Sequence, residues 1–164
     1  MFRNLGKGQF EKVSDSLGPD FMRPIVGRGL ATADFDNDGD IDIATNNSGD
    51  YPSLLRNDGG NANRWLTVLL IGTKSNRDGT GASLKLSSEG VAHVEQAKGG
   101  MGYMSASDPR IHFGLGKSTK IDFLEVTWPS GQVDHLVNVP VDSIIAVKEG
   151  VGIVPHPFPK VTRR

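Results

Sequence analysis

The sequence predicts an all-β protein whose C-terminal part is an antiparallel β-sandwich or a partly open barrel. After residue 64, short segments with alternating polar and apolar residues recur at intervals of roughly 8–12 residues, a spacing typical of such folds. The chain has 21 glycines and 9 prolines among 164 residues, so it is expected to turn often. None of its segments keeps a helical period of 3.6 residues, which argues against long helices.

Each C-terminal strand is predicted from its own pattern. Residues 65–71 are almost entirely apolar, which suits a strand buried on both faces. In residues 82–87 apolar and polar side chains alternate, which suits a strand with one buried face. The apolar positions of 121–128 change parity after Phe123, and we expect a β-bulge there. The other expected strands are 91–97, 111–115, 132–139 and 143–148.

The N-terminal part is also predicted to consist of short strands. Residues 1–4 and 9–14 should pair as a hairpin, because a Gly-containing turn separates them. Residues 30–33 and 41–45 flank an acidic loop, and 53–56 form a further short strand.

Composition excludes several classes of function. The net charge is −1, so the overall charge balance does not favour nucleic acid or an anionic membrane as a partner. There is no cysteine, which excludes disulfides and thiolate metal sites. No apolar run reaches the ~18 residues that a membrane-spanning helix needs. The N-terminus has no apolar signal core, so the chain either stays in the cytosol or is a piece of a longer, exported protein.

The segment Asp34–Asp42, Asp-Phe-Asp-Asn-Asp-Gly-Asp-Ile-Asp, places a carboxylate at every second position. Calcium takes about six to eight oxygen ligands at about 2.3–2.6 Å, and a chain wrapped around it points alternate side chains inward. Gly39 occupies loop position 6, where a calcium loop turns sharply. We therefore predict a Ca²⁺ site formed by the side chains of Asp34, Asp36, Asp38 and Asp42 and the main-chain carbonyl of Asp40. The side chain of Asp40 is expected to point outward, and Asn37 to support the turn.

The alternative is a solvated acidic turn, but five like charges so close together repel one another without a cation. The loop is not an EF-hand, because that loop closes with a glutamate at position 12, where this chain has Thr45. The flanking segments are also predicted strands, so the loop should join two strands.

The acidic loop and its flanks resemble a known repeat. Gly29–Ala33, the loop Asp34–Asp42 and Ile43–Asn46 together resemble the FG-GAP/VCBS repeat, the blade unit of integrin-α-like propellers. Phe2–Val13 resembles the outer half of a preceding blade, and 54–60 resembles the equivalent segment of the next one. The resemblance implies an incomplete β-propeller-like blade at the N-terminus.

From about Asn63 to Glu149 the chain resembles the ASPIC/UnbV domain. The stretches that carry this resemblance are Trp65-Leu66, Gly72–Ala82, Gly99–Ser105, His112–Gly116 and Val126–Gly131. In that family the domain follows several repeats, in exported bacterial proteins and in cartilage acidic protein, and no enzymatic activity is established for it. The resemblance implies the C-terminal part of such a protein.

Both resemblances together imply a domain organisation. Residues 1–62 would be partial FG-GAP/VCBS repeats with the calcium loop, 63–150 an ASPIC/UnbV-like β-domain, and 151–164 an extended Pro-rich tail. A propeller needs about four or more blades, so the blade must pack on the C-terminal domain or on another copy of the chain. Exposed blade edges make a homo-oligomer an expected form of association.

The function implied by the resemblance is that of a calcium-binding, non-catalytic binding or adhesion module, extracellular or periplasmic. Its ligand would be a protein or a carbohydrate. One alternative is a purely structural module that calcium rigidifies, and another is an accessory domain of a carbohydrate-active protein.

Two further segments bear on function. Gly99–Ser105 holds three glycines, which allow a ligand to approach closely, and Tyr103 could stack on a sugar; a tight turn with Tyr103 buried is the alternative. Ser105, Asp108 and His112 are close in sequence, but no nucleophile elbow or oxyanion loop accompanies them. No catalytic residue is therefore expected.

Overall fold

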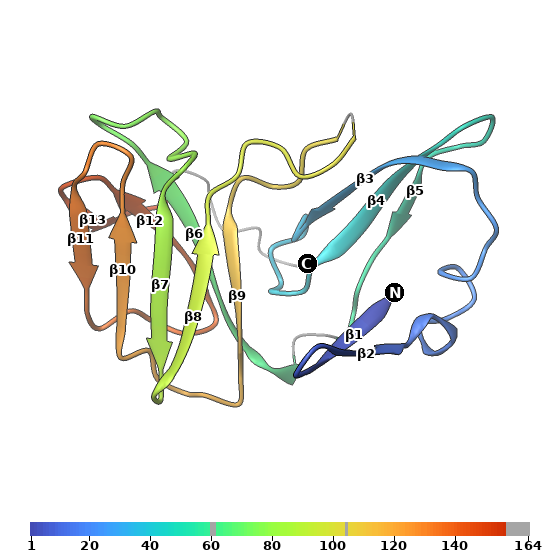
Figure 1. Ribbon diagram of the computed structural model, residues 1–164, viewed down its shortest axis with the longest axis horizontal. Coiled ribbons are helices and arrows are strands. Elements are labelled where there is room, and N and C mark those ends of the chain that lie inside the picture. The colour runs from blue at the N-terminus through green and yellow to red at the C-terminus, as the bar shows by residue number, and fades with distance from the viewer. Residues whose placement is uncertain (60–61, 104, 157–164) are drawn as a thin grey trace.

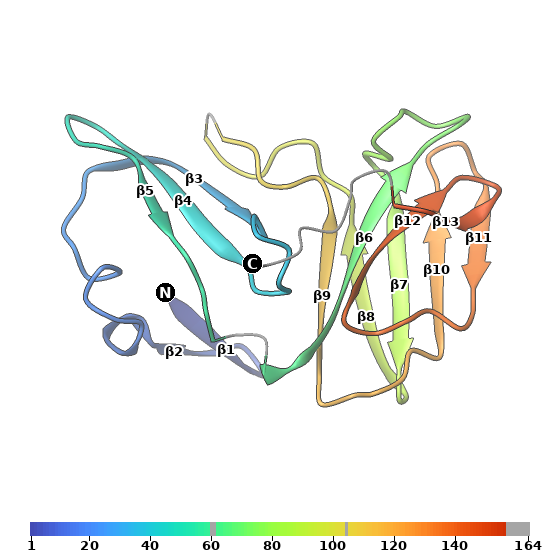
Figure 2. The same ribbon diagram turned by 180° about the vertical axis from the view of Figure 1, so that it is seen from behind.

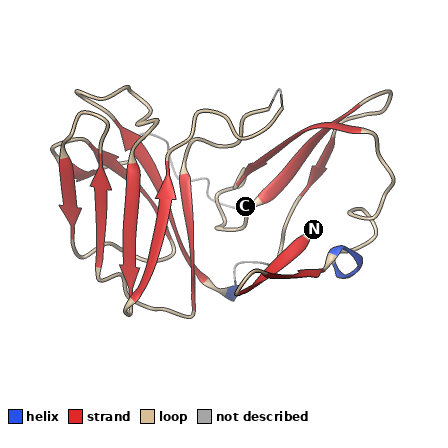
Figure 3. Ribbon diagram, in the orientation of Figure 1, coloured by secondary structure: helices blue, strands red, loops and turns tan. Residues whose placement is uncertain are grey.

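The computed structural model describes residues 1–59, 62–103 and 105–156, which form two β-rich parts that lie side by side (Figures 1 and 2). The N-terminal part contains β1 (Phe2–Gly6), β2 (Gln9–Lys12), the 3₁₀ turn η1 (Ser14–Ser16), β3 (Gly27–Ala33), β4 (Asp42–Asn47) and β5 (Ser53–Leu55). The C-terminal part contains β6 (Arg64–Ile71), β7 (Ser83–Ser88), β8 (Val91–Gln96), β9 (Ile111–Gly116), β10 (Phe123–Thr127), β11 (Val133–Leu136), β12 (Ser143–Lys148) and β13 (Gly152–Val154). The predicted all-β fold is confirmed, and Figure 3 shows helix only in short turns.

The C-terminal part is a sandwich of two four-stranded sheets. One sheet has the order β11-β10-β7-β8 and the other β13-β12-β6-β9. Within them the described strand pairs are antiparallel, apart from β6 and β12, which run parallel. Strand β8 contacts β9, and β11 contacts β13, so the two sheets are in contact along both edges of the sandwich. No helix in the described part of the chain has the length and apolar character to cross a membrane.

The core of the sandwich is built from alternate residues of facing strands. Leu66, Val68 and Leu70 of β6 point into it, and Leu84 and Leu86 of β7 face them from the other sheet. Leu66, Val68, Leu84 and Leu86 are completely buried. Burying a leucine or valine side chain stabilises a fold by about 1.5–3 kcal/mol, so each of these residues contributes substantially to the stability of the sandwich. The other core residues on strands are Ile111, Phe113, Leu115, Leu124, Val126, Ile145 and Val147.

A buried carboxylate closes one end of the sandwich. Glu149 is 2% exposed and accepts hydrogen bonds from the backbone N–H groups of Thr73, Lys74 and Ser75 at 2.7, 2.7 and 2.8 Å. The hydroxyl of Ser130 also donates to it. Burial favours a raised pKa, but these hydrogen bonds outweigh it and hold the pKa of Glu149 far below its usual range. The carboxylate therefore fixes the loop after β6 against the end of β12.

Two sequence predictions need correction here. The β-bulge expected at Phe123 is absent, because β10 keeps a continuous register with β7 from Phe123 opposite Ser87 to Thr127 opposite Ser83. Ile121 precedes the strand, which explains the change of parity. Residues 152–154, expected in the tail, form β13 and pair with β12. The sandwich thus continues beyond residue 150, and 157–164 lie outside the described residues.

The N-terminal part has two small sheets, a hairpin of β1 and β2 and a three-stranded antiparallel sheet β3-β4-β5. The buried apolar residues of the described chain all belong to the C-terminal part, beginning with Leu66. In the N-terminal part the buried side chains are polar instead: Asp34, Asp40, Asp42 and Asn47. This part therefore has no apolar core of its own among the described residues, and its most buried region is the acidic loop.

Candidate metal centre

The acidic loop joins two neighbouring antiparallel strands, as predicted. Strand β3 ends at Ala33, which lies opposite Asp42 at the start of β4. The chain can reverse in so few residues because Asn37 and Gly39 adopt left-handed backbone angles, with φ of +60° and +96°. The predicted roles of these two residues in the turn are therefore borne out by the backbone geometry.

Three of the predicted ligands converge. Carboxylate oxygens of Asp34, Asp36 and Asp42, one from each residue, all lie within 4.8 Å of one another. Two ligands of one calcium ion, each about 2.3–2.6 Å from it, cannot be farther apart than about 5.2 Å. The three oxygens therefore have a spacing that fits a single calcium coordination sphere.

The backbone of the loop holds two of these carboxylates in place. Asp34 accepts hydrogen bonds from the N–H groups of Asp38 and Gly39 at 3.0 and 2.9 Å. Asp42 accepts hydrogen bonds from the N–H groups of Phe35 and Asn57 at 3.2 and 2.8 Å. Because a carboxylate offers about four lone-pair sites, oxygens held in this way can still bind a cation.

Electrostatics also fit a cation. Asp34 and Asp42 are each 2% exposed. Burial raises the pKa of Asp34 above its ordinary value, although the hydrogen bonds from Gly39 and Asp38 act in the opposite direction. The Asp38 carboxylate adds repulsion that raises it further. A divalent cation would supply the opposite charge that a buried acidic cluster requires.

The two remaining predicted ligands are placed differently. Asp38 lies outside the group of three, and its Oδ1 accepts the N–H of Asp40 at 2.9 Å. Asp40 also lies outside the group of three, and it is 2% exposed, so its side chain is buried and does not point into solvent as expected. The tight turn at Gly39 folds the residue that follows it back into the protein.

Sequence reasoning missed Arg110, which lies beside the loop. Its Nη1 donates to Asn37 Oδ1 at 2.6 Å, and its Nη2 donates to the main-chain oxygen of Asp34 at 2.7 Å. Its Nε donates to Asp108 Oδ2 at 2.7 Å. Arg110 is separated from Asp34 by 76 residues, so no local pattern could have indicated the contact.

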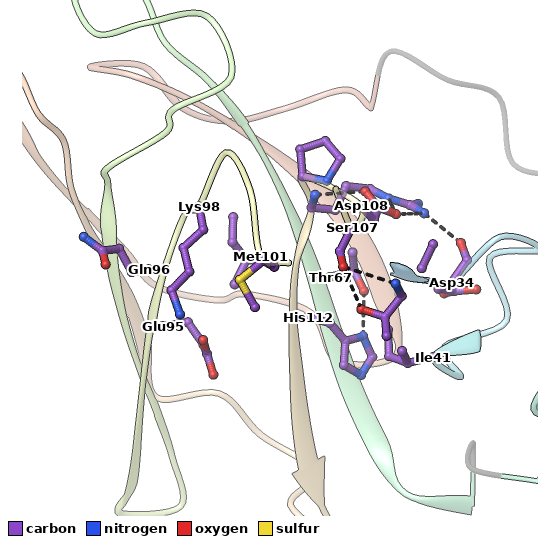
Figure 4. A pocket seen from close by; sticks show the side chains of 15 residues that line it. Asp34, Ile41, Thr67, Glu95, Gln96, Lys98, Met101, Ser107, Asp108 and His112 are labelled. Carbon is purple, nitrogen blue, oxygen red and sulfur yellow. Dashed lines mark hydrogen bonds and ion pairs between the residues drawn. The ribbon is translucent and has the colours of Figure 1, made fainter. Parts of the chain in front are cut away.

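A cavity of about 270 Å³ lies beside this contact, between the N-terminal sheet and the sandwich. Figure 4 shows Asp34 and Ile41 at the right, Ser107, Asp108 and His112 in the middle, and the lining residues Glu95, Gln96 and Lys98 at the left. Because residues of both parts line this cavity, the acidic loop lies at the junction of the two parts of the chain.

The other two sequence candidates can now be placed. Ser105 donates to the Tyr103 carbonyl at 3.0 Å, Asp108 pairs with Arg110, and His112 shares a hydrogen bond with Thr67 at 3.0 Å. These three residues are thus each engaged elsewhere and do not form a triad. Tyr103 is 79% exposed, so the alternative of a buried tyrosine is wrong. Met104, in the same loop, lies outside the described residues.

Comparison with known proteins gives a match to a family model and to several curated proteins. A family model described as ASPIC and UnbV matches residues 72–154. The chain is 33% identical over 139 residues to cartilage acidic protein 1 of Xenopus tropicalis and 32% identical over 140 residues to that of Homo sapiens. Each alignment covers 81% of this chain, which is more than its C-terminal part, but only 21% of the relative. The chain thus spans about a fifth of the length of these relatives.

Proposed function

Because the chain belongs to the ASPIC and UnbV family, we propose that it is a calcium-binding, non-catalytic binding or adhesion module and part of a longer repeat protein. The observation that carries calcium binding is the convergence of Asp34, Asp36 and Asp42 oxygens within 4.8 Å, with two of the three carboxylates almost wholly buried. Burying carboxylates together is unfavourable unless a cation or another partner balances their charge.

We propose that residues 1–62 are partial FG-GAP/VCBS repeats. The strands β3, β4 and β5 form the kind of short antiparallel sheet that a blade requires, and the acidic loop lies between its first two strands. The hairpin of β1 and β2 would belong to a preceding blade. The relatives are named for cartilage, and we propose an extracellular or periplasmic location for this chain.

Calcium titration of the full chain tests the proposed site. Isothermal calorimetry should detect binding of one Ca²⁺, and a saturating concentration should raise the melting temperature relative to chelator. A hundredfold excess over Kd stabilises the folded state by about 2.7 kcal/mol. For a chain of this size, each kcal/mol shifts the melting temperature by about 2–4 °C, so the rise should be about 5–11 °C.

Asp36→Ala is the informative variant, because it removes one of the three converging carboxylates, and this one lies at the least buried position of the three. It should abolish most of the calcium-dependent rise. Asp78→Ala is the matched control, since its side chain is 56% exposed and pairs with Arg77 in a loop of the sandwich. Equal melting temperatures in calcium and in chelator would contradict the proposed site.

We further propose that the ligand of this module is a carbohydrate, and one observation favours it. Tyr103 and Met101 are 79% and 62% exposed on the same Gly-rich loop, and an exposed tyrosine offers a face on which a sugar ring can stack. A glycan array probed with the wild-type chain and with Tyr103→Ala tests this. Binding that is lost in the variant supports a sugar ligand, whereas the absence of any bound glycan in calcium favours a purely structural module.

A further inference from the structure

The acidic loop contacts the sandwich as well as its own sheet. The N–H of Asp108 donates to the carbonyl oxygen of Thr32 at 3.0 Å, and the N–H of Thr32 donates to Ser107 Oγ at 3.1 Å. The segment before β9 is therefore bound to the end of β3, immediately before the loop begins. The contact joins residues 75 positions apart, so it joins the two parts of the chain.

Arg110 continues this contact into the loop itself. One guanidinium group binds the side chain of Asn37, the main-chain oxygen of Asp34 and the carboxylate of Asp108. The side chains of Arg110 and Asp108 are only 16% and 18% exposed, so water competes weakly for these hydrogen bonds. The planar guanidinium can satisfy three acceptors at fixed angles, which a lysine ammonium on a flexible stem cannot do equally well.

Gly39 provides a second contact with the sandwich. A Cβ atom at this position would lie 2.1 Å from Nε1 of Trp65, so the loop backbone is pressed against the indole of β6. The Trp65 ring stacks in turn on His112, with ring centroids 6.1 Å apart. The loop thus contacts the sandwich at two points: Arg110 binds Asn37, and Trp65 packs against Gly39.

We propose that Arg110 is a positioning residue that couples cation binding in the Asp34–Asp42 loop to docking of the N-terminal sheet on the sandwich. This inference rests on the proposed calcium binding. By fixing the main chain at Asp34 and the turn at Asn37, Arg110 orients the carboxylates that converge on the site. Coupling between two equilibria is reciprocal, so a bound cation stabilises docking to the same extent that docking strengthens cation binding.

If Arg110 acted only through its positive charge, its removal would change the calcium affinity in the opposite direction. A guanidinium next to a cation site repels the cation, so removing its charge should strengthen binding. In this structure the Asp108 carboxylate is paired with Arg110 and offsets its charge, so we expect the hydrogen bonds to Asn37 and Asp34 to outweigh the repulsion. The sign of the change in calcium affinity therefore separates the two accounts.

The test uses Arg110→Met, which keeps much of the aliphatic stem but removes the charge and every donor. Calcium affinity is measured by calorimetry on the full chain. Docking is measured by hydrogen exchange at the Asp108 amide, which donates across the junction. In the wild type, calcium should slow this exchange. In Arg110→Met, the Kd should rise roughly 5- to 150-fold, and calcium should no longer slow the exchange.

Three further variants complete the design. Arg110→Lys keeps the charge and should restore the affinity only in part. Asn37→Gly removes one acceptor while tolerating the φ of +60°, and it should weaken calcium binding with little effect on folding. Arg77→Met is the matched control, because that guanidinium pairs with Asp78 and its side chain is 87% exposed. It should leave both measurements unchanged.

The outcomes are distinguishable. If the wild type binds no calcium, both the proposed function and this inference fail. If the wild type binds calcium but Arg110→Met and Asn37→Gly bind it equally well or more tightly, the coupling is overturned while the calcium site stands. If Arg110→Met lowers the melting temperature equally in calcium and in chelator, Arg110 has a structural role only.

Discussion

Replacing Gly39 by alanine should open the N-terminal sheet, because the added methyl group would overlap the indole of Trp65. A Cβ atom there would lie 2.1 Å from Nε1 and 2.2 Å from Cε2 of that ring. The φ of +96° would strain an alanine by about 1–2 kcal/mol. Forcing Trp65 away from its stack with His112 adds an overpacking cost of about 1–3 kcal/mol. The free energy of opening should therefore fall by about 2–5 kcal/mol.

Gly49→Ala is the matched control for this prediction. Gly49 lies in the turn between β4 and β5 of the same three-stranded sheet and also has a positive φ, +71°, but a Cβ atom there meets nothing within 4 Å. It should cost only the backbone strain, about 1–2 kcal/mol. Hydrogen exchange at the Asp38 amide, which donates to Asp34, reports opening of the loop in both variants. The difference between them isolates the contact with Trp65.

Removing the Trp65 indole should relieve the effect of Gly39→Ala. In the background Trp65→Val, where the indole is gone, Gly39→Ala should cost no more than Gly49→Ala. If Gly39→Ala and Gly49→Ala accelerate exchange equally when Trp65 is present, the close contact between loop and sandwich does not exist in solution.

Three other measurements address the sandwich. Leu84→Ala should lower the free energy of unfolding by about 2–5 kcal/mol in urea denaturation, because Leu84 is completely buried. Its control is Lys85→Ala on the outer face, which should change the free energy of unfolding by less than about 0.5 kcal/mol. Similar losses in the two variants would contradict the assignment of Leu84 to the core. Hydrogen bonds lower the folded pKa of Glu149, so its stabilisation is complete above the ordinary value of 4.5 and is lost as the pH falls below it. Glu149→Gln should therefore be less stable than wild type at pH 7, with a gap that narrows on acidification, and a gap independent of pH would contradict this. Burial, with a smaller effect of Arg110, lowers the pKa of His112, so its NMR titration should have a midpoint below 6.5, and a midpoint above 6.5 would count against the buried environment.

Much of the fold was predictable because local patterns determine it. The strand Ser143–Lys148 was predicted with its observed bounds, since its apolar run lies between clear turn signals. Strand β13 was missed because three residues that begin with Gly152 and precede Pro155 carry too little pattern to indicate a strand. The parallel pairing of β6 with β12 depends on how distant segments fold back, which periodicity does not reveal.

For the candidate site, the sequence predicted the loop but not all of the residues that shape it. The spacing of the aspartates and the position of Gly39 pointed to a loop between two strands, and the structure has such a loop. The spacing did not distinguish Asp38 from the carboxylates that converge, because alternate positions in the loop look alike in the sequence and only the folded loop shows which oxygens lie together. Arg110 could not be found at all, since it reaches the loop only through the tertiary fold.

The polar interior of the N-terminal part has a consequence for the order of events during synthesis. Residues 1–59 leave the ribosome before the sandwich does, yet the described residues among them form no buried apolar core that could hold them folded. The hydrogen bond between Asp34 and Arg110 cannot form until Arg110 has been synthesised, 76 residues after Asp34. At about 5–20 residues per second this is a delay of roughly 4–15 s. Residues 1–59 therefore reach their final arrangement only after the sandwich, which provides their docking surface, has been synthesised.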